Sequence, residues 1–123
     1  AAGAGGMQRL SRMIPLKKAM GMMLTGRHVS AKEGFELGFV TEVVPHAELM
    51  SAARRWASDI LACSPMSVRA TKQVVMRSLD VPSLEVAMHN LHYPAFVAMT
   101  KSEDTVEGPR AFAEKRKPNW KGR

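Results

Sequence analysis

The chain has 123 residues, of which 46% are hydrophobic and 24% are charged, a composition typical of a globular protein. No segment approaches the roughly 18 consecutive apolar residues that a membrane span needs, and a single cysteine, Cys63, excludes an internal disulfide. The formal charge of +7 indicates an anionic partner: nucleic acid, a phosphorylated ligand or an acidic part of a longer chain. Nucleic acid is disfavoured because zinc-finger spacing, an aromatic RNA-binding strand and a long basic helix are all missing from the sequence.

The first part of the chain is predicted to be helical after a glycine-rich turn at residues 3–6. Because no methionine precedes this turn, we expect the chain to be a fragment of a longer protein. A short helix is predicted over 7–13. A second helix is predicted over 15–24, with proline in its first turn and Gly26 as its stop.

The next segment combines a helix with the only predicted strand. Ser30 and Glu33 form an S-x-x-E capping box, and Gly38 ends the helix about two turns later. Residues 39–44, "FVTEVV", are predicted to form a short strand that Pro45 closes. A single strand of this size is not stable alone, so we expect it to pair with a segment that this chain lacks.

The rest of the chain is predicted to be helical. Apolar residues at helical spacing predict an amphipathic helix over 47–62, and "SP" then starts another over 65–79. A third helix begins at Pro82 and is kinked or restarted at Pro94. The methionines, ten in all, indicate adaptable core packing or a methionine-rich helix interface.

The C-terminal stretch "SEDTVEGPRAFAEKR" at 102–116 predicts two short helices. Ser102 is the expected N-cap of the first helix, with acidic residues in its first turn. Gly108 is expected to end this helix, and Pro109 to begin the second. Trp120 is predicted to anchor the tail that follows.

The histidines, the cysteine and four glutamates could in principle bind a metal or catalyse a reaction, but each has a structural explanation. The four histidines lack the ligand spacing of a metal site, and His89 and His92, at i and i+3 of a predicted helix, are expected at the surface or an interface. Cys63 is expected to be an inert buried thiol. Four glutamates could act as a general base, but capping, first-turn and solvent-facing roles explain them: Glu33, Glu36, Glu85 and Glu107.

Three segments in this order resemble a known family: "GAGGMQRLSRMIP" at 3–15, "LTGRHVSAKEGFELGFVTEVVP" at 24–45, and "SEDTVEGPRAFAEKRKPNWKGR" at 102–123. Together they are similar to the C-terminal part of the enoyl-CoA hydratase/isomerase (crotonase) family, and the resemblance covers essentially the whole chain. The final segment, with "HYP" at 92–94, is especially similar to carnitinyl-CoA dehydratases, a branch of that family.

The resemblance implies a mainly α chain with one short strand, which forms the C-terminal part of an α/β spiral of ββα turns. Residues 1–45 would form the end of the spiral core, and residues 46–123 a helical trimerisation and lid region. The expected protein is a cytoplasmic homo-trimer or hexamer without a membrane segment. No cofactor is expected apart from the coenzyme A of the substrate.

The resemblance also implies chemistry on an acyl-CoA thioester. In the family, two backbone N–H groups hold the thioester oxygen as it becomes an enolate, and one or two glutamates move a proton and position water. These groups lie upstream in the family, so no catalytic residue is expected in this chain. The alternatives are an enoyl-CoA isomerase or carnitinyl-CoA dehydratase, a non-catalytic oligomerisation domain, or a basic nucleic-acid-binding module.

Three residues match substrate-binding positions of the family. Gly3 corresponds to a glycine whose N–H helps to hold water or substrate, and a simple tight turn is the alternative. Phe112 and Lys115 correspond to residues that reach the CoA of a neighbouring subunit, and at i and i+3 they are expected on one helix face. Lys115 could instead be a solvated cation at a helix end. Four further cations are expected to supply a general positive field: Arg116, Lys117, Lys121 and Arg123.

Overall fold

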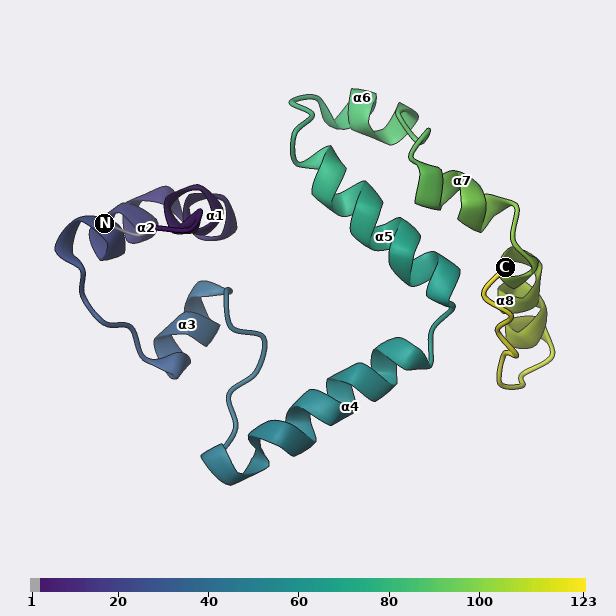
Figure 1. Ribbon diagram of the computed structural model, residues 1–123, viewed down its shortest axis with the longest axis horizontal. Coiled ribbons are helices and arrows are strands. Elements are labelled where there is room, and N and C mark those ends of the chain that lie inside the picture. Colours follow the sequence, from purple (N-terminus) through teal and green to yellow (C-terminus); the bar gives the residue numbers. More distant parts are fainter. Residues whose placement is uncertain (1–2) are drawn as a thin grey trace. The chain divides into compact units, whose positions relative to one another are not determined.

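The computed structural model describes residues 3–123. The chain divides into two compact units, Ala1–Met50 and Ser51–Arg123. The helices, shown in Figure 1, are α1 Gly6–Met13, α2 Leu16–Thr25, α3 Ala31–Leu37, the single 3₁₀ turn η1 His46–Glu48, α4 Leu49–Leu61, α5 Pro65–Ser78, α6 Leu84–His89, α7 Pro94–Thr100 and α8 Glu103–Ala113. The boundary between the units falls near the start of α4. No helix of the described chain is long and apolar enough to cross a membrane.

The helix ends of the first unit follow the local sequence signals. Gly26 and Gly38 end α2 and α3 in the left-handed conformation, with φ of 65° and 92°. Such a conformation costs glycine little because it has no Cβ atom. The Ser30 hydroxyl accepts a hydrogen bond from the Glu33 N–H at 3.1 Å, as the predicted cap requires. The Glu33 carboxylate binds the Arg27 guanidinium at 2.5 and 3.0 Å, which lowers the pKa of Glu33.

The predicted strand at 39–44 is not formed, and residues 3–123 contain no strand. A strand needs a ladder partner for its backbone groups, and this unit supplies none. The N–H groups of Phe39 and Val40 donate instead to the carbonyl oxygen of Gly34, at 3.1 and 3.2 Å. Gly34 is a glycine because of this approach, since a Cβ atom there would lie 2.8 Å from a methyl group of Val40.

Helices α4 to α7 agree with the predicted ranges to within a few residues. The helix expected from Pro82 begins at Leu84, where the Ser83 hydroxyl accepts from the Val86 N–H at 3.3 Å. Pro94 starts α7 as its first helical residue rather than kinking the preceding helix. Helices α5 and α7 pack together (Figure 1), and the Gln73 side chain accepts from the Ala95 N–H at 2.8 Å. This bond satisfies a donor that the start of α7 leaves free.

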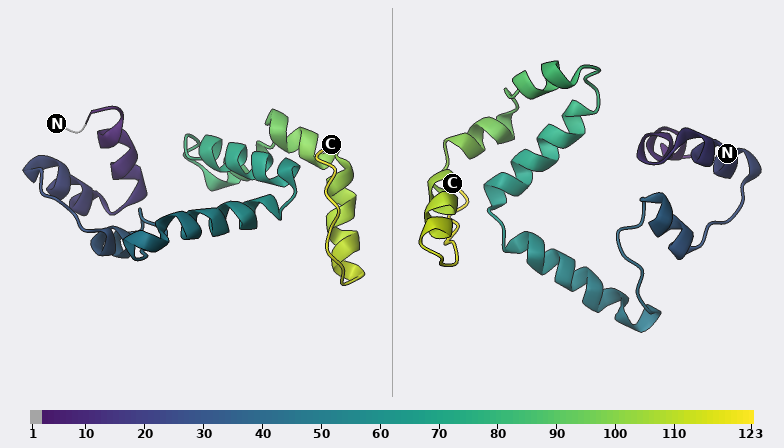
Figure 2. Two further views of the ribbon diagram at one scale, coloured as in Figure 1. Left: turned by 60° about the horizontal axis from the view of Figure 1, so that its bottom comes forward. Right: turned by 180° about the vertical axis from the view of Figure 1, so that it is seen from behind.

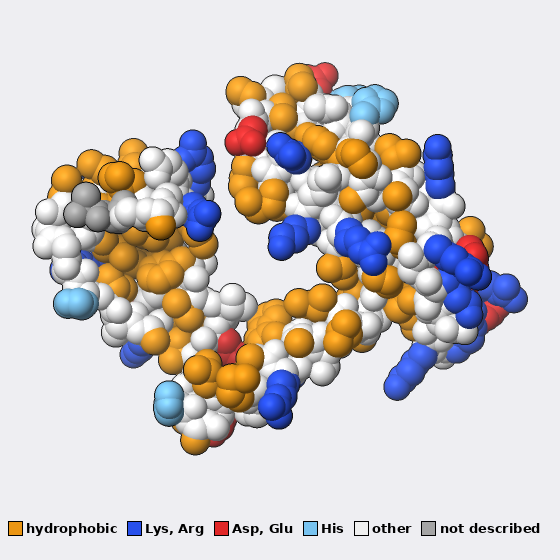
Figure 3. Space-filling model, in the orientation of Figure 1, with side chains coloured by type: hydrophobic (Ala, Val, Ile, Leu, Met, Phe, Trp, Pro, Cys, Tyr) orange, Lys and Arg blue, Asp and Glu red, His pale blue; other side chains and the backbone are white. Residues whose placement is uncertain are grey.

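The described chain buries few large apolar side chains. Its buried hydrophobic residues are Ile14 and five alanines, and no large side chain in the described part is fully buried. Large apolar residues are exposed on most helices, including Leu24, Leu61, Leu84 and Phe112. Hydrophobic side chains cover much of α4 and α5 on the face shown in Figure 3. Apolar side chains that gather on a surface, rather than standing singly, are typical of places where another surface packs.

Candidate functional site

The C-terminal stretch forms one helix instead of the two that its glycine and proline predict. Helix α8 passes through Gly108 and Pro109 without a break. Gly108 does not stop the helix; it leaves room for the indole of Trp120, because a Cβ atom there would lie 3.3 Å from the ring. Ser102 occupies the N-cap position as predicted, but its hydroxyl makes no capping hydrogen bond, because it donates to the carbonyl oxygen of Met99 at 2.7 Å.

The tail at 114–123 folds back along α8, as Figure 2 shows. The acidic residues on this side of the helix hold it: Glu103, Asp104 and Glu107. At the far end of the tail, the Glu103 N–H donates to the Arg123 carbonyl oxygen at 2.7 Å, and the Arg123 side chain binds the Glu103 carboxylate at 3.0 Å. The tail is therefore an ordered part of the unit rather than a frayed end.

Trp120 anchors the tail, as predicted. Its Nε1–H donates to the carbonyl oxygen of Ala62 at 2.8 Å, and its ring lies over Gly108. Ala62 belongs to the elbow at 62–64 between α4 and α5. The indole thus joins the tail, α8 and the elbow.

Glu107 closes the middle of the tail. Its carboxylate binds the Arg116 guanidinium at 2.6 and 3.0 Å and accepts from the Asn119 N–H at 2.7 Å. Arg116 also binds Glu114 at 2.5 Å. The Arg116 guanidinium, followed by the Asn119 N–H, lowers the pKa of Glu107 from 4.5 to about 2.

We expect acid to release this part of the tail. Because the folded pKa of Glu107 is depressed, its contribution to stability is present above pH 4.5 and is lost as the pH falls toward 2. In the full-length protein, the NMR amide resonance of Asn119, whose N–H donates to Glu107, should therefore shift over this interval. Glu107→Gln should weaken the acid-induced change and shift the neutral-pH spectrum toward the acid form. Identical acid titrations of the two proteins would contradict this role for Glu107.

Phe112 and Lys115 lie at the end of α8, but not on one helix face. The helix ends at Ala113, and Lys115 follows it in the left-handed conformation with φ of 53°. The Lys115 N–H donates to the Phe112 carbonyl oxygen at 3.1 Å and the Arg116 N–H to that of Ala111 at 3.0 Å, which is the Schellman turn. Glycine is the usual residue at this position, since the left-handed conformation costs other residues roughly 1–2 kcal/mol.

Both side chains at this end are exposed. The Phe112 side chain is 87% exposed, which is unusual for so large an apolar group. Lys115 is exposed and makes no ion pair with any described residue. The turn therefore presents an aromatic ring and an ammonium group to solvent, three residues apart in the chain.

Two of the four cations that were expected to supply a general positive field are paired with acidic residues. Arg116 is bound by Glu107 and Glu114, and Arg123 by Glu103. Within residues 3–123, Lys117 and Lys121 make no ion pair. Sequence reasoning missed the bound arginines because their partners are set by the folding of the tail, although acidic residues at i, i+1 and i+4 of α8 facing a basic tail were a usable signal.

Gly3 belongs to the other unit, Ala1–Met50, and is described within it. Its carbonyl oxygen accepts from the Gly6 N–H at 2.9 Å, which closes a turn ahead of α1. Gly5, the N-cap residue of α1, has the left-handed conformation with φ of 83°. Gly3 is exposed, and no atom lies within 4 Å of the place where a Cβ atom would be. The turn thus leaves open space beside the Gly3 backbone.

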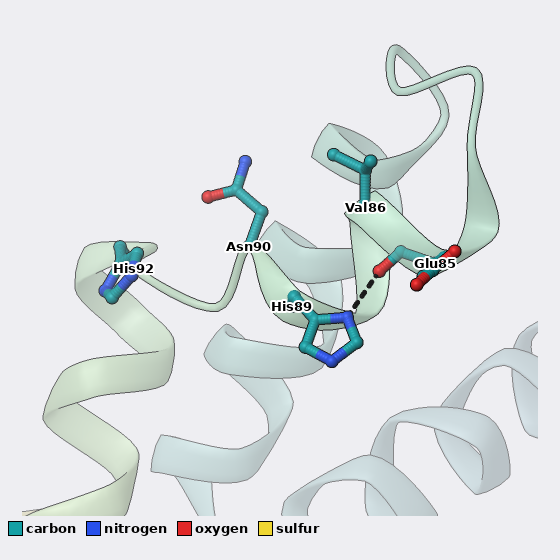
Figure 4. Close-up of a pocket in the computed structure, with 5 residues that line it drawn as sticks. All are labelled: Glu85, Val86, His89, Asn90 and His92. Atoms are coloured by element: carbon teal, nitrogen blue, oxygen red, sulfur yellow. Dashed lines mark hydrogen bonds between the residues drawn. The ribbon is translucent and has the colours of Figure 1, made fainter.

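The two histidines of the second unit do not share a helix face. Helix α6 ends at His89, so His92 lies beyond it. Both line a hollow of about 380 Å³, shown in Figure 4, where the His89 Nδ1 atom is hydrogen-bonded to the Glu85 carbonyl oxygen at 2.8 Å. Nowhere between residues 3 and 123 do three or more His, Cys, Asp or Glu side chains converge in a metal-binding arrangement.

Cys63 is exposed, so the prediction of a buried thiol is wrong. It lies in the elbow between α4 and α5, where the chain leaves one helix before starting the next. There it lines an apolar groove of about 480 Å³ together with Ile60, Val68, Val75 and Met76, among others. Its thiol contacts the Asp59 carbonyl oxygen at 3.5 Å.

Comparison with known proteins shows what kind of chain this is. It matches the enoyl-CoA hydratase/isomerase family over residues 1–123. It is 38% identical to the carnitinyl-CoA dehydratase of Salmonella typhi over 125 residues, which covers 98% of this chain and 47% of that protein. The chain thus spans about half the length of the curated relatives it matches.

Solved structures of enoyl-CoA hydratases are also similar to this chain. The structure of an enoyl-CoA hydratase from Mycobacterium marinum matches with a TM-score of 0.88 and 36% identity, over 100% of this chain and 48% of that one. An enoyl-CoA hydratase from Bacillus anthracis matches with a TM-score of 0.88 and 36% identity, over 98% of this chain and 46% of that one. The architecture is that of the C-terminal, helical part of the crotonase fold. The chain belongs to the enoyl-CoA hydratase/isomerase family.

Proposed function

We propose that the protein is an acyl-CoA hydratase or lyase, which adds water to a CoA thioester or eliminates it through an enolate. The observation that carries this proposal is the family match over residues 1–123. Dehydration of a carnitinyl-CoA thioester is the second candidate, favoured by the 38% identity to carnitinyl-CoA dehydratases. An isomerase of the same family is a further alternative.

We propose that this chain contributes to substrate binding and supplies no group that transfers a proton. The Glu33 carboxylate pairs with Arg27 and the Glu107 carboxylate with Arg116, and the other two glutamates considered above lie on exposed helix surfaces. None is therefore proposed as a general acid or base. Phe112 would pack against the adenine of the CoA, and Lys115 would bind a phosphate group. Gly3 would hold water or substrate through its backbone N–H. CoA enters as part of the substrate, and no separate cofactor is proposed.

We also propose a homo-trimer or a dimer of trimers in the cytoplasm, with residues 1–45 in the spiral core and residues 46–123 in the trimerisation and lid region. The exposed apolar faces of the helices support this assembly, because such faces are typical of places where another surface packs. In such an assembly, Phe112 and Lys115 would reach the CoA of a neighbouring subunit.

A substrate survey tests the proposed reaction. The full-length protein should hydrate crotonyl-CoA or a carnitine-derived enoyl-CoA thioester, which is followed by the loss of the conjugated thioester absorbance. The preferred substrate separates the hydratase from the carnitinyl-CoA dehydratase. Movement of the double bond without water uptake would identify an isomerase, and no turnover of any of these thioesters would contradict the proposal.

Lys115→Ala tests the proposed binding role. We expect CoA-ester affinity to fall about tenfold in the full-length protein, which is the effect of losing one charge-assisted, partly exposed contact. The loss should appear in KM rather than kcat, because a contact remote from the reacting bond holds the ground and transition states alike. Added salt should diminish the effect by screening the phosphate.

Lys117→Ala is the matched control, since Lys117 is an exposed cation of the same tail without an ion pair among the described residues. It should change KM much less than Lys115→Ala. Equal CoA affinities of the parent and Lys115→Ala proteins in low-salt calorimetry would show that the turn has only a structural role.

A further inference from the structure

Asp104 is the one buried ionisable residue in the part of the chain that the structure describes. Its side chain is almost completely buried, at 3% exposure, in the first turn of α8. One carboxylate oxygen, Oδ2, accepts from the Ser64 hydroxyl at 2.6 Å. The other, Oδ1, accepts from the N–H groups of Lys121 and Gly122, at 2.7 and 3.2 Å. All of these donors lie far from Asp104 in the chain.

These contacts join three separate pieces of the unit. Ser64 belongs to the elbow and caps α5, since its oxygen also accepts from the Met66 and Ser67 N–H groups at 3.2 and 3.3 Å. The Lys121 and Gly122 amides belong to the end of the tail. One carboxylate therefore holds the elbow, the start of α8 and the tail in a single arrangement.

The charge of Asp104 suits this role. Burial by itself would raise the pKa of its carboxyl group, but the Ser64 hydroxyl and the Lys121 and Gly122 N–H groups lower it overall. The side chain is thus charged at neutral pH, and hydrogen bonds to a charged acceptor are roughly twice as strong as neutral ones. A neutral side chain of the same shape would hold the tail less firmly.

The hydrogen bonds of Asp104, called the clamp below, restrain the segment that carries Lys115. Residues 114–120 run between the end of α8 and the amides that Asp104 holds. The Schellman turn closes one end of this segment, the Glu107–Arg116 pair its middle, and Asp104 its far end. The left-handed Lys115 lies within the turn, so its position depends on where the returning tail is fixed.

We propose that Asp104 is a positioning residue for CoA-ester binding: by fixing the tail to α8 and the elbow, it holds Phe112 and Lys115 in the place where the ligand meets them. This inference rests on the proposed function, because it takes the ligand to be the CoA thioester. Asp104 touches no substrate in this scheme and acts through the turn.

Two substitutions in the full-length protein test the inference by kinetics. Asp104→Ala should raise KM for the CoA ester about tenfold, as Lys115→Ala does, with kcat changed less than about twofold. Asp104→Asn keeps the shape and one acceptor oxygen, which can still accept from the Lys121 and Gly122 N–H groups, but it loses the charge and the acceptor for the Ser64 hydroxyl. It should therefore fall between Asp104→Ala and the parent. The double variant Asp104→Ala/Lys115→Ala should bind no more weakly than either single variant, because both remove the same contact.

Glu103→Gln is the matched control. It changes the neighbouring acid of the same helix, whose carboxylate makes only a weak, exposed pair with Arg123. The Glu103 N–H that binds the Arg123 carbonyl oxygen is a backbone group and is kept, so the end of the tail stays in place and KM should be nearly unchanged. Hydrogen exchange of the Lys121 and Gly122 amides supplies a readout that does not involve activity. Exchange at both amides should become faster in Asp104→Ala and, to a lesser extent, in Asp104→Asn.

The outcomes separate this inference from the proposed function. Unchanged exchange in Asp104→Ala would overturn the clamp. Faster exchange with an unchanged KM, where Lys115→Ala does raise KM, would overturn the positioning role and leave the proposed function intact. No effect of Lys115→Ala on CoA affinity would instead overturn the binding role itself. If Asp104→Ala does not fold, Asp104→Asn carries the test, with faster exchange and a KM raised by about threefold as the supporting result.

Discussion

Expressed by itself, the 123-residue chain is expected to unfold gradually, without a cooperative transition, and to bind an apolar dye such as ANS. Cooperative unfolding requires a core that offsets the backbone entropy of folding, roughly 1–2 kcal/mol per residue. Each fully buried Leu, Ile or Phe contributes about 1.5–3 kcal/mol toward this. The described residues bury Ile14 and five alanines instead, while Leu24, Leu61 and Leu84 are exposed.

Calorimetry and circular dichroism during heating would measure this directly, with the full-length protein as the control. The full-length protein should melt sharply and bind little dye, because the exposed apolar faces would then be covered. The chain by itself should also fail to hydrate crotonyl-CoA, since no residue in it is proposed to transfer a proton. A sharp melt of the isolated chain with matching calorimetric and van't Hoff enthalpies would contradict the first expectation.

Trp120→Ala is expected to destabilise the full-length protein by about 2 kcal/mol and to loosen the tail. Truncating a fully buried tryptophan costs about 3–5 kcal/mol, and Trp120 is only partly buried, so the lower value applies. The substitution removes the ring that lies over Gly108 and the hydrogen bond to Ala62 at 2.8 Å. Urea denaturation monitored by circular dichroism measures the free energy of unfolding.

Trp120→Phe divides this effect into its parts. It keeps an aromatic ring near Gly108 but removes the indole N–H, so we expect a loss of about 1 kcal/mol, close to the value of one hydrogen bond. The Ala variant should also raise KM for the CoA ester, because the tail that carries Lys115 loses its anchor. A Trp120→Ala protein as stable as the parent would show that the anchor does not hold the tail in solution.

Local sequence signals determined the helices of this protein and most of their ends. Gly26 and Gly38 stop α2 and α3, Ser30 caps α3, and Pro94 starts α7, as predicted. These signals are reliable because each acts within one turn of helix: a glycine adopts positive φ, a hydroxyl accepts a nearby N–H, and a proline lacks an N–H that its position does not need. The family resemblance was likewise readable, since it depends on residue types at fixed spacing.

Long-range contacts decided the rest. Residues 39–44 have the composition of a strand, but a strand forms only where a second one supplies hydrogen-bond partners. By local sequence signals, Gly108 should end one helix and Pro109 should begin the next, yet α8 continues through both. Trp120, twelve residues further along the chain, lies against Gly108. The candidate site follows the same division. Phe112 and Lys115 could be chosen from the sequence, whereas the left-handed turn that presents them and the Asp104 carboxylate that fixes the tail depend on residues that only the folded chain brings together.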